Sequence, residues 1–183
     1  MSVEVYDNLF DENNFNKLKS IVESVDFPWT RSRIVNEDHH QVKINNRTRV
    51  LMDRKYNHQF VHFLYENSTP RSEFSHEVLK LFIQVLDDKV PIRSILRAKV
   101  NFNSCTENIV EHAFHHDYNP TRYPDLKTVL FYINTNDGYT LFEDGNKVES
   151  VANRCVIMTK NILHTGTNCT NDFGRIVVVI NYL

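Results

Sequence analysis

Hydrophobic and polar positions follow two different periods along this chain, a helical one in the first half and an alternating one in the second. In the first half, apolar residues recur three and four positions apart in two stretches, which predicts helices over about 12–24 and 71–88. Asp11 is a suitable N-cap for the first helix, and Pro28 and Pro91 end the two helical patterns. The first half of the chain is therefore predicted to be largely helical.

The second half of the chain alternates between apolar and polar residues, as half-buried strands do. It predicts consecutive strands over 94–103, 109–117, 127–134, 139–143, 147–151, 154–159 and 174–183, preceded in the first half by short strands over 3–6 and 58–65. Asp144 and Gly145 form a favoured hairpin turn between two of these strands. Helices followed by a run of antiparallel strands predict an α+β, mainly β fold: a double-sheet jelly roll with the N-terminal helices packed outside.

The length and composition fit one domain. The 183 residues are 41% hydrophobic, which is enough for one sizeable core and too little for two. We expect a single domain over 1–183, with a helical part over about 1–92 and a jelly-roll core over about 94–183. The polar segment 30–57 has no clear period, and the sequence leaves open whether it is a solvated loop or a flap over a substrate.

The charge and the cysteine content narrow the partners and the compartment. A net charge of −2 and a pI near 6.5 provide no broad basic surface, so binding to nucleic acid or to a membrane is not expected. Three cysteines without a C-x-x-C spacing indicate a reducing compartment. The N-terminus has no basic leader and no apolar run is long enough to span a membrane, so we expect a cytoplasmic protein. The sequence does not indicate an oligomeric state.

The candidate chemistry is carried by the stretch HAFHHD, which ends at Asp117. His115 and Asp117 are two residues apart, so on an extended strand their side chains leave from the same side and can meet one cation. Much later in the chain, His164 completes a 2-His-1-carboxylate set of the kind that holds non-haem Fe(II). We interpret His112 as structural, and His116, which points away from the Asp117 side, as a neighbour of the site.

Arg175 opens the last strand and is the second candidate for a functional residue. If it points into the barrel, its guanidinium needs an anion, which is either a ligand carboxylate or an internal acidic residue. Tyr132 lies on an earlier strand and can offer its hydroxyl to the same carboxylate. A lone His-x-Asp pair or a lone arginine is a weak signal, because most such residues are structural. The hypothesis therefore depends on the four residues occurring together, in order, in an all-β half.

The set of motifs HHD, KTVLFYIN, GYTLFEDG, ILHTG and RIVVVINYL resembles the iron(II)/2-oxoglutarate-dependent dioxygenases. It is most similar to their prolyl-4-hydroxylase-like branch, with its double-stranded β-helix, and to short phage and bacterial members of that branch. The resemblance implies that the iron ligands are His115, Asp117 and His164. It also implies that Arg175 holds the distal carboxylate of 2-oxoglutarate with help from Tyr132, and that Asn101 lines the cofactor pocket.

The sequence departs from the family pattern at three places. The interval between His164 and Arg175 is at the long end of the usual range, and Val177 stands where many members have a serine or threonine that contacts the carboxylate. Asn181 stands where the nucleic-acid-repair branch has a second arginine. The absence of that arginine counts against an alkylated-base demethylase, and so against nucleic acid as a partner.

The activity implied by the resemblance is hydroxylation of a C–H bond, with Fe(II) as cofactor, 2-oxoglutarate and O₂ as cosubstrates, and succinate and CO₂ as products. The first substrate candidate is a prolyl residue of a peptide or protein, and the second is a free amino acid. Two other classes stay open: a non-catalytic jelly-roll protein with a binding or structural role, and a cupin-like metalloenzyme without 2-oxoglutarate. A cupin-like metalloenzyme that does not use 2-oxoglutarate has no need of Arg175 at the start of the last strand.

Overall fold

The computed structural model describes residues 3–34, 40–44, 47–51, 57–87, 89 and 91–183. Within these residues the helices are α1 (Glu12–Val22) and α2 (Ser75–Leu86). The strands are β1 (Val3–Tyr6), β2 (Thr30–Ser32), β3 (His40–Ile44), β4 (Arg47–Leu51), β5 (Gln59–Glu66), β6 (Thr69–Pro70), β7 (Ile95–Ser104), β8 (Val110–Glu111), β9 (Lys127–Tyr132), β10 (Tyr139–Phe142), β11 (Lys147–Glu149), β12 (Arg154–Met158), β13 (His164–Gly166) and β14 (Gly174–Tyr182).

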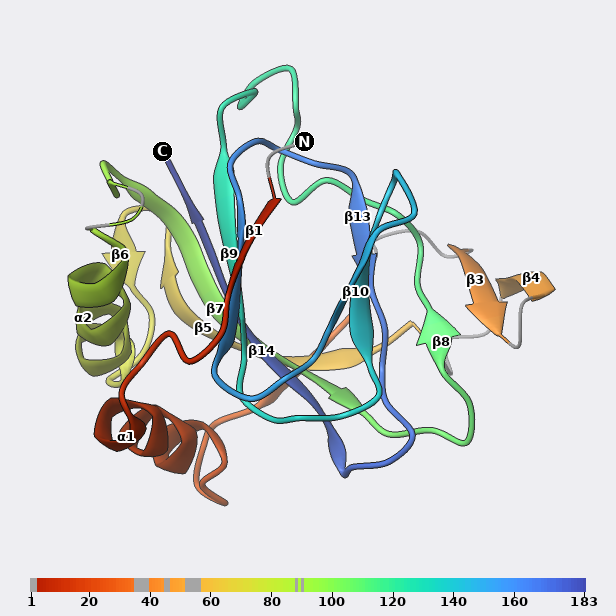
Figure 1. Cartoon of the computed structure of the whole chain (residues 1–183), viewed down its shortest axis with the longest axis horizontal. Helices are drawn as coiled ribbons and strands as arrows, with labels where there is room; N and C mark the ends of the chain where they lie inside the picture. The colour runs from red at the N-terminus through yellow and green to blue at the C-terminus, as the bar shows by residue number, and fades with distance from the viewer. Residues whose placement is uncertain (1–2, 35–39, 45–46, 52–56, 88, 90) are drawn as a thin grey trace.

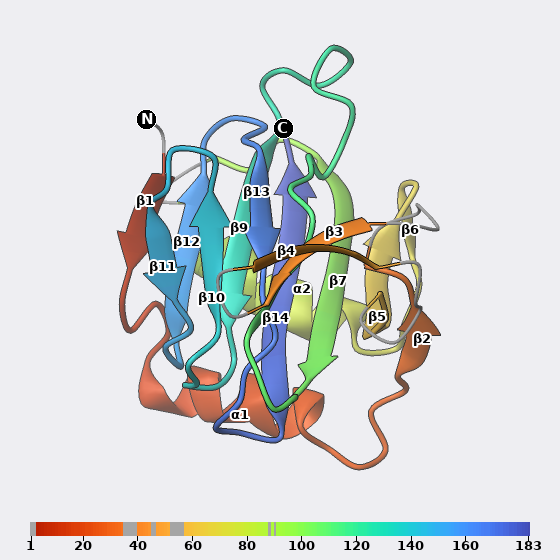
Figure 2. The ribbon, with the colours of Figure 1, turned by 90° about the vertical axis from the view of Figure 1, so that its right-hand side faces the viewer.

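The strands form a large antiparallel sheet that faces a smaller one (Figures 1 and 2). The large sheet has the order β1-β12-β9-β14-β7-β5-β2, with β6 paired to β5 beside it. The smaller sheet has the order β11-β10-β13, and a third sheet, β4-β3-β8, continues on the same side of the molecule. Two facing antiparallel sheets confirm the predicted jelly roll.

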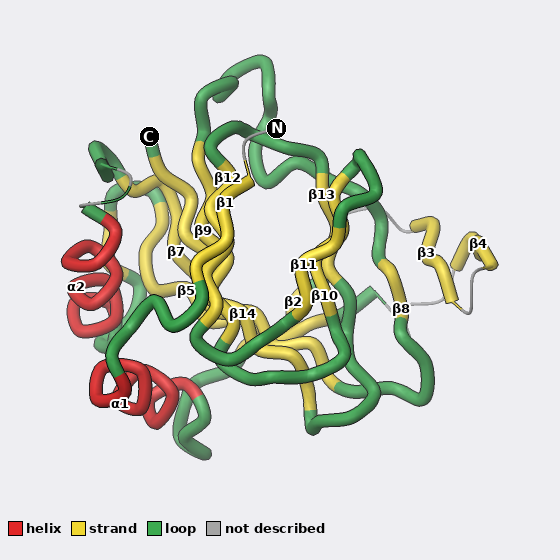
Figure 3. Tube along the Cα trace, viewed as in Figure 1, coloured by secondary structure: helices red, strands yellow, loops and turns green. Residues whose placement is uncertain are grey.

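Both helices cover the outer face of the large sheet, on the side away from β10 and β13 (Figure 3). Helix α1 begins as predicted, because the Asp11 carboxylate accepts a hydrogen bond from the backbone N–H of Asn14 at 2.9 Å. It ends at Val22, so the helical spacing stops well before Pro28. The outer core joins apolar residues of both helices to the sheet, among them Leu18, Val22, Val78, Phe82, Phe131, Val178 and Ile180. The helices are thus packed outside the barrel, as the pattern indicates.

The central strand β14 is buried along its whole length, and its two faces differ. Ile176, Val178, Ile180 and Tyr182 belong to the outer core under the helices. Val177 and Val179 belong to a second, inner core that lies between the two sheets. Arg175 is on that same inner face, because successive side chains of a strand point to opposite sides. The sequence pattern predicts this division into two faces, and the structure shows that the face with the arginine is the inner one.

The predicted strand over 109–117 is wrong in its extent. Regular pairing stops at Glu111, where β8 pairs with β3. Beyond it the chain meets β13 through single hydrogen bonds of His112 to Gly166 and Thr165 and through the isolated bridge between His115 and His164. His112 and His115 are three residues apart and would point to opposite sides of a regular strand. Both nevertheless line the same cavity. The alternation is therefore broken between them, which the polar sequence of this stretch does not reveal.

The N-terminal part also builds the large sheet, although the sequence analysis expects it to be mainly helical. Strand β1 pairs with β12 at one edge, and β5 pairs with β7 toward the other. Segment 30–57 contains β2, β3 and β4, so it is not simply loop. Residues 35–39, 45–46 and 52–56, on which the flap interpretation depends, lie outside the described residues. The flap therefore stays a prediction.

The cysteines and the helices bear on the compartment. The three cysteines are free thiols, with Cys155 and Cys169 buried and Cys105 exposed. None of the described helices has both the length and the apolar character that a membrane crossing requires.

Candidate metal centre and its cavity

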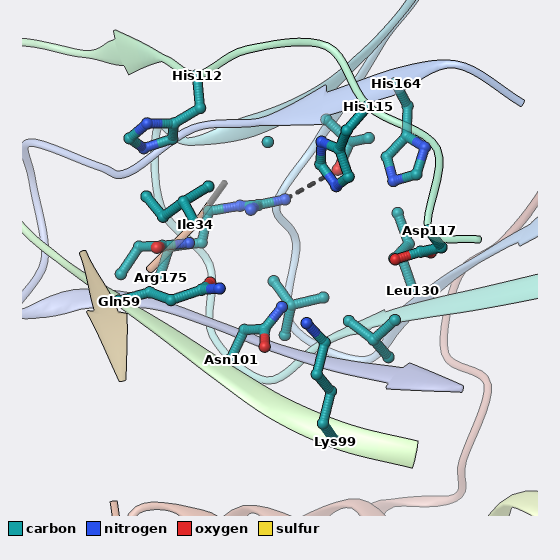
Figure 4. A pocket seen from close by; sticks show the side chains of 15 residues that line it. Ile34, Gln59, Lys99, Asn101, His112, His115, Asp117, Leu130, His164 and Arg175 are labelled. Carbon is teal, nitrogen blue, oxygen red and sulfur yellow. Dashed lines mark hydrogen bonds between the residues drawn. The ribbon is translucent and has the colours of Figure 1, made fainter. Parts of the chain in front are cut away.

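Three predicted residues meet at the mouth of the barrel between β8 and β13. His115 and His164 face each other across an isolated bridge, in which each backbone N–H donates to the other residue's carbonyl, at 2.9 and 3.1 Å. One ligand atom from each of His115, Asp117 and His164 lies within 4.8 Å of the other two. Figure 4 shows the two imidazoles and the carboxylate turned toward a common point. The described part of the chain thus contains a group of side chains with the composition of a 2-His-1-carboxylate site.

Backbone carbonyls set the tautomer of both histidines. Nδ1 of His115 lies 3.2 Å from the carbonyl oxygen of Ala113, and Nδ1 of His164 lies 2.9 Å from that of Ile162. A carbonyl oxygen only accepts hydrogen bonds, so each Nδ1 carries the proton and donates it. The lone pair of each neutral ring is therefore on Nε2, which is free to bind a metal.

The Asp117 carboxylate is held by residues on three strands of the large sheet. Its Oδ1 accepts a hydrogen bond from Arg97 of β7 at 2.9 Å, within a largely buried ion pair. Its Oδ2 accepts from Asn181 of β14 at 2.9 Å and from Thr128 of β9 at 3.4 Å. Arg97 Nε also donates to Asn181 Oδ1, which joins these groups into one network. Asn181 and Arg97, on adjacent strands, thus hold the same carboxylate.

The electrostatic environment keeps Asp117 and His115 in the protonation states that bind metals. Burial acts to raise the pKa of Asp117, but the electrostatic effect of the neighbouring His164, Arg97 and Lys99 outweighs it, so the pKa lies well below its usual range. The pKa of His115 is lowered mainly by burial and, to a smaller extent, by the neighbouring His164. A carboxylate anion beside a neutral imidazole is the combination that a divalent cation requires.

Arg175 lies at the other end of the cavity and is 3% exposed. Its Nε donates to Ser150 Oγ at 2.6 Å and its Nη2 to Thr140 Oγ1 at 2.9 Å, the contact drawn as a dashed line in Figure 4. Its Nη1 donates to the carbonyl of Thr167 at 3.3 Å. All three acceptors are neutral, and Arg175 forms no ion pair within the described residues. The guanidinium is therefore buried without a counter-charge, a costly state that an anionic ligand would relieve.

Tyr132 lies under Arg175 and is not among the side chains that line the cavity. The Arg175 guanidinium is 5.1 Å from the centre of its ring, and its hydroxyl donates to Thr140 Oγ1 at 2.8 Å. It is Thr140 that faces the cavity. Tyr132 thus contacts Arg175 and Thr140, and the direct contact between its hydroxyl and a ligand carboxylate stays a prediction.

The cavity runs from the three candidate ligands to Arg175, with a mixed polar and apolar wall (Figure 4). Leu130, Val177 and Val179 form its apolar wall, and Asn101 faces it as the sequence analysis expects. His112, interpreted above as structural, also lines it, because the break after Glu111 turns its side chain inward.

Four residues of this region are not predicted from the sequence to be functional: Arg97, Lys99, Thr140 and Ser150. Arg97 and Lys99 alternate with Ala98 and Val100, which is typical of a strand with one solvent-exposed face. Only the structure shows that this face is turned toward the cavity. The two hydroxyl residues carry no signal, because serine and threonine are common in every part of a β protein.

No protein-family model matches this sequence, and no curated protein shows significant sequence similarity to it. Solved structures do match over the whole chain. A prolyl-4-hydroxylase from Pseudomonas putida is 10% identical with a TM-score of 0.63, covering 99% of this chain and 91% of that one. A viral collagen prolyl hydroxylase from Paramecium bursaria Chlorella virus-1, in complex with 2-oxoglutarate, is 12% identical with a TM-score of 0.57, covering 100% and 97%.

A third structure carries a peptide. A prolyl hydroxylase from Trichoplax adhaerens, in complex with a fragment of the hypoxia inducible factor oxygen degradation domain, is 12% identical with a TM-score of 0.64. The match covers 100% of this chain and 83% of that one. At such low identity the likeness establishes the fold: this chain has the double-stranded β-helix found in prolyl hydroxylases and other 2-oxoglutarate and iron(II) oxygenases.

Proposed function

We propose that this protein is an Fe(II)- and 2-oxoglutarate-dependent dioxygenase that hydroxylates a C–H bond. The observation that carries the proposal is a single cavity with a 2-His-1-carboxylate group at one end and an uncompensated buried arginine at the other. A molecule with a 2-oxo acid at one end and a carboxylate at the other matches both ends. The fold shared with 2-oxoglutarate oxygenases supports the same conclusion.

His115, Asp117 and His164 are the proposed metal ligands. Their donor set of two imidazole nitrogens and one carboxylate oxygen is typical of non-haem Fe(II), and it leaves coordination positions for cosubstrate and O₂. The side chains fit this role because the Nε2 lone pairs are free and the carboxylate is anchored by Arg97 and Asn181. Such anchoring of a ligand fixes its orientation before the metal arrives.

Arg175 is the proposed partner of the distal carboxylate of 2-oxoglutarate. Its guanidinium is already oriented by Ser150 and Thr140, so little freedom is lost when a carboxylate binds. An arginine–carboxylate contact is charge-assisted and stronger than the neutral hydrogen bonds present now. Tyr132 supports this arginine from below through its ring and Thr140, and we propose an indirect role for it.

When bound, Fe(II), 2-oxoglutarate and O₂ replace a C–H hydrogen of the substrate by hydroxyl, with succinate and CO₂ as the other products. The chain contributes position and environment. Arg175 orients the cosubstrate toward the ligands, which raises the fraction of productive encounters. Leu130, Val177 and Val179 exclude water from the reacting groups.

The substrate candidates are a prolyl residue of a peptide or protein and a free amino acid. The hydroxylase from Trichoplax adhaerens binds a peptide, which supports the first. We further propose that the protein acts in the cytoplasm and has no nucleic-acid partner, on the basis of its charge and free thiols. The alternative function is a non-catalytic jelly-roll protein that binds a ligand or has a structural role.

The test is an anaerobic titration of metal-free protein with Fe(II) and then with 2-oxoglutarate, following the visible charge-transfer band of the iron–oxo acid complex. We expect a band in the wild type, no band in His115→Ala, and a band in Arg175→Met only at much higher 2-oxoglutarate. The control is His76→Ala, which removes an exposed imidazole from helix α2. Succinate release on admission of O₂ follows the same order of variants.

A wild type that shows no band at saturating metal and 2-oxoglutarate contradicts the proposal and favours the non-catalytic alternative. A band that survives in His115→Ala as strongly as in His76→Ala would remove His115 from the ligand set. Either outcome is decided by the spectrum alone, before any substrate is known.

A further inference from the structure

Lys99 projects from β7 into the cavity, between the candidate metal ligands and Arg175. It lines the cavity with Asn101, two residues further along the same face of the strand. Figure 4 shows its ammonium end turned toward the middle of the cavity, next to the Asn101 amide. A lysine side chain more often carries its charge out to water, so an inward-pointing ammonium is informative.

The ammonium group of Lys99 has no direct partner. Within the described part of the chain Lys99 Nζ makes no hydrogen bond and no ion pair. Burial, followed by the repulsion of Arg97, lowers the pKa of Lys99 to about 8, although Asp117 and Glu66 attract the charge from a distance. The side chain is therefore still mainly cationic at neutral pH, in a place where a cation without a partner is unfavourable.

A count of charges shows that the proposed cofactors do not supply this partner. Asp117 is already paired with Arg97, and Arg175 is assigned to the distal carboxylate of 2-oxoglutarate. The proximal carboxylate of the cosubstrate has the metal as its counter-charge. Lys99 is then the one cavity cation, among the described residues, that is still without an anion when metal and cosubstrate are bound.

Two amides on the same strand as Lys99, Asn101 next to it and Asn103 nearer Arg175, have unused hydrogen-bonding capacity. The Oδ1 atoms of Asn101 and Asn103 are buried and have no hydrogen-bond partner. Both residues line the cavity on the same strand face as Lys99. A buried acceptor without a donor is unfavourable, so these atoms favour a ligand that brings N–H groups. The ligand that these groups favour has an anionic oxygen for Lys99 and N–H donors for the asparagine oxygens. A free amino acid has both.

We propose that Lys99 binds a carboxylate of the primary substrate, and that this substrate is a small carboxylic acid such as a free amino acid. The inference rests on the proposed function, since it assumes a cosubstrate between Arg175 and the metal. A prolyl residue inside a peptide offers only neutral amides to Lys99 and leaves its ammonium unpaired. The structure thus favours the free amino acid over the internal prolyl residue.

The test measures binding without turnover. Anaerobic protein loaded with Fe(II) and 2-oxoglutarate is heated with each of the common L-amino acids, with the matching carboxamides, and with a peptide that contains an internal proline. A ligand that binds only the folded protein raises Tm, on the order of 5 °C when its concentration is about 100 times Kd. We expect at least one acid to raise Tm, and its carboxamide and the peptide to have no effect.

The variants identify the group responsible. Lys99→Met keeps the length of the side chain and should abolish the increase in Tm, whereas Lys99→Arg should retain part of it. Lys80→Met makes the same chemical change at an exposed position of helix α2 and should behave as the wild type. A charge-transfer band of normal strength in Lys99→Met would show that the variant is folded and loaded.

Three outcomes would overturn the inference. The first is that no acid raises Tm more than its carboxamide does. The second is that the peptide raises Tm and the acids do not. The third is that Lys99→Met, with no substrate present, lowers the affinity for 2-oxoglutarate as much as Arg175→Met does. Lys99 would then be a residue that binds the cosubstrate. Failure of the proposed function itself is recognised separately, because the wild type then shows no charge-transfer band.

Discussion

The two faces of the large sheet are built from the same strands and serve different purposes. On the outer face, β9 and β14 present mainly apolar side chains to the helices, including Phe131, Val178 and Ile180. On the inner face, the same strands present Arg175, Thr128 and Asn181 alongside a few aliphatic residues. Neighbouring residues of one strand thus lie in environments of opposite character, one packed for stability and the other arranged around a cavity.

This difference indicates that the outer face contributes mainly to stability and the inner face mainly to binding. Burial of apolar surface is the main favourable contribution to folding, and the outer face provides it. Buried polar groups contribute little net stability and are costly when left without partners. Their concentration on the inner face is therefore explained by binding, and substitutions on the two faces should have separable effects.

The largest expected effect is on the outer face. Phe131→Ala removes a fully buried ring that contacts Phe10 and Phe82 edge to face, with centroids 5.1 and 5.3 Å away. We expect the free energy of unfolding to fall by about 3–5 kcal/mol, measured by urea denaturation. Val25→Ala, at a 99% exposed position, should change it by less than about 0.5 kcal/mol. A small loss in Phe131→Ala would contradict the assignment of stability to this face.

Next in size is Arg175→Met on the inner face. It replaces a buried charge by an apolar chain of similar length, so stability should change by no more than about 1 kcal/mol. The loss of a charge-assisted contact should raise the Kd for 2-oxoglutarate by roughly 10- to 100-fold. The anaerobic titration measures this Kd. Arg71→Met changes an exposed arginine and serves as the control. A variant that unfolds easily while binding 2-oxoglutarate normally would make Arg175 a structural residue.

Asn181→Leu tests the anchoring of the Asp117 carboxylate. Its amide is fully buried and donates to Asp117 Oδ2 and to Thr128 Oγ1. Loss of this hydrogen bond to the Asp117 carboxylate should lower metal affinity by about 10-fold. Groups that orient a metal ligand typically contribute a factor of about 10 to 100. Competition titration with a metal chelator measures this. Asn16→Leu, on the exposed side of helix α1, should leave metal affinity unchanged. Equal affinities in both variants would argue against a positioning role.

The smallest expected effect belongs to Tyr132→Phe. The ring under Arg175 is kept, and the hydroxyl is lost together with its hydrogen bond to Thr140 Oγ1 and its interaction with the Arg175 guanidinium. The free energy of unfolding should fall by about 1 kcal/mol, and the Kd for 2-oxoglutarate should rise by less than about threefold. Calorimetric titration of the two proteins distinguishes this from direct contact. A loss as large as that in Arg175→Met would show that the hydroxyl reaches the ligand.

Much of this arrangement can be predicted from the sequence, because it depends on residues that are close together in the chain. The alternation in 174–183 predicts which residues of β14 share a face, and Asp11 marks the start of α1. The spacing of His115 and Asp117 correctly predicts that they lie together, although the strand on which the argument relied stops at Glu111. The isolated bridge between His115 and His164 keeps this part of the chain beside β13.

The sequence by itself determined the class of the fold, the two faces of the main strands and the residues that meet in the candidate metal site. These depend on periodicity and on residue chemistry, which are properties of short segments. The tertiary structure alone decided which groups surround that site: that Arg97 and Asn181 hold Asp117, that Tyr132 supports Arg175 through Thr140, and that Lys99 faces the cavity unpaired. Such contacts join strands far apart in the chain, and only the sheet order brings those strands together.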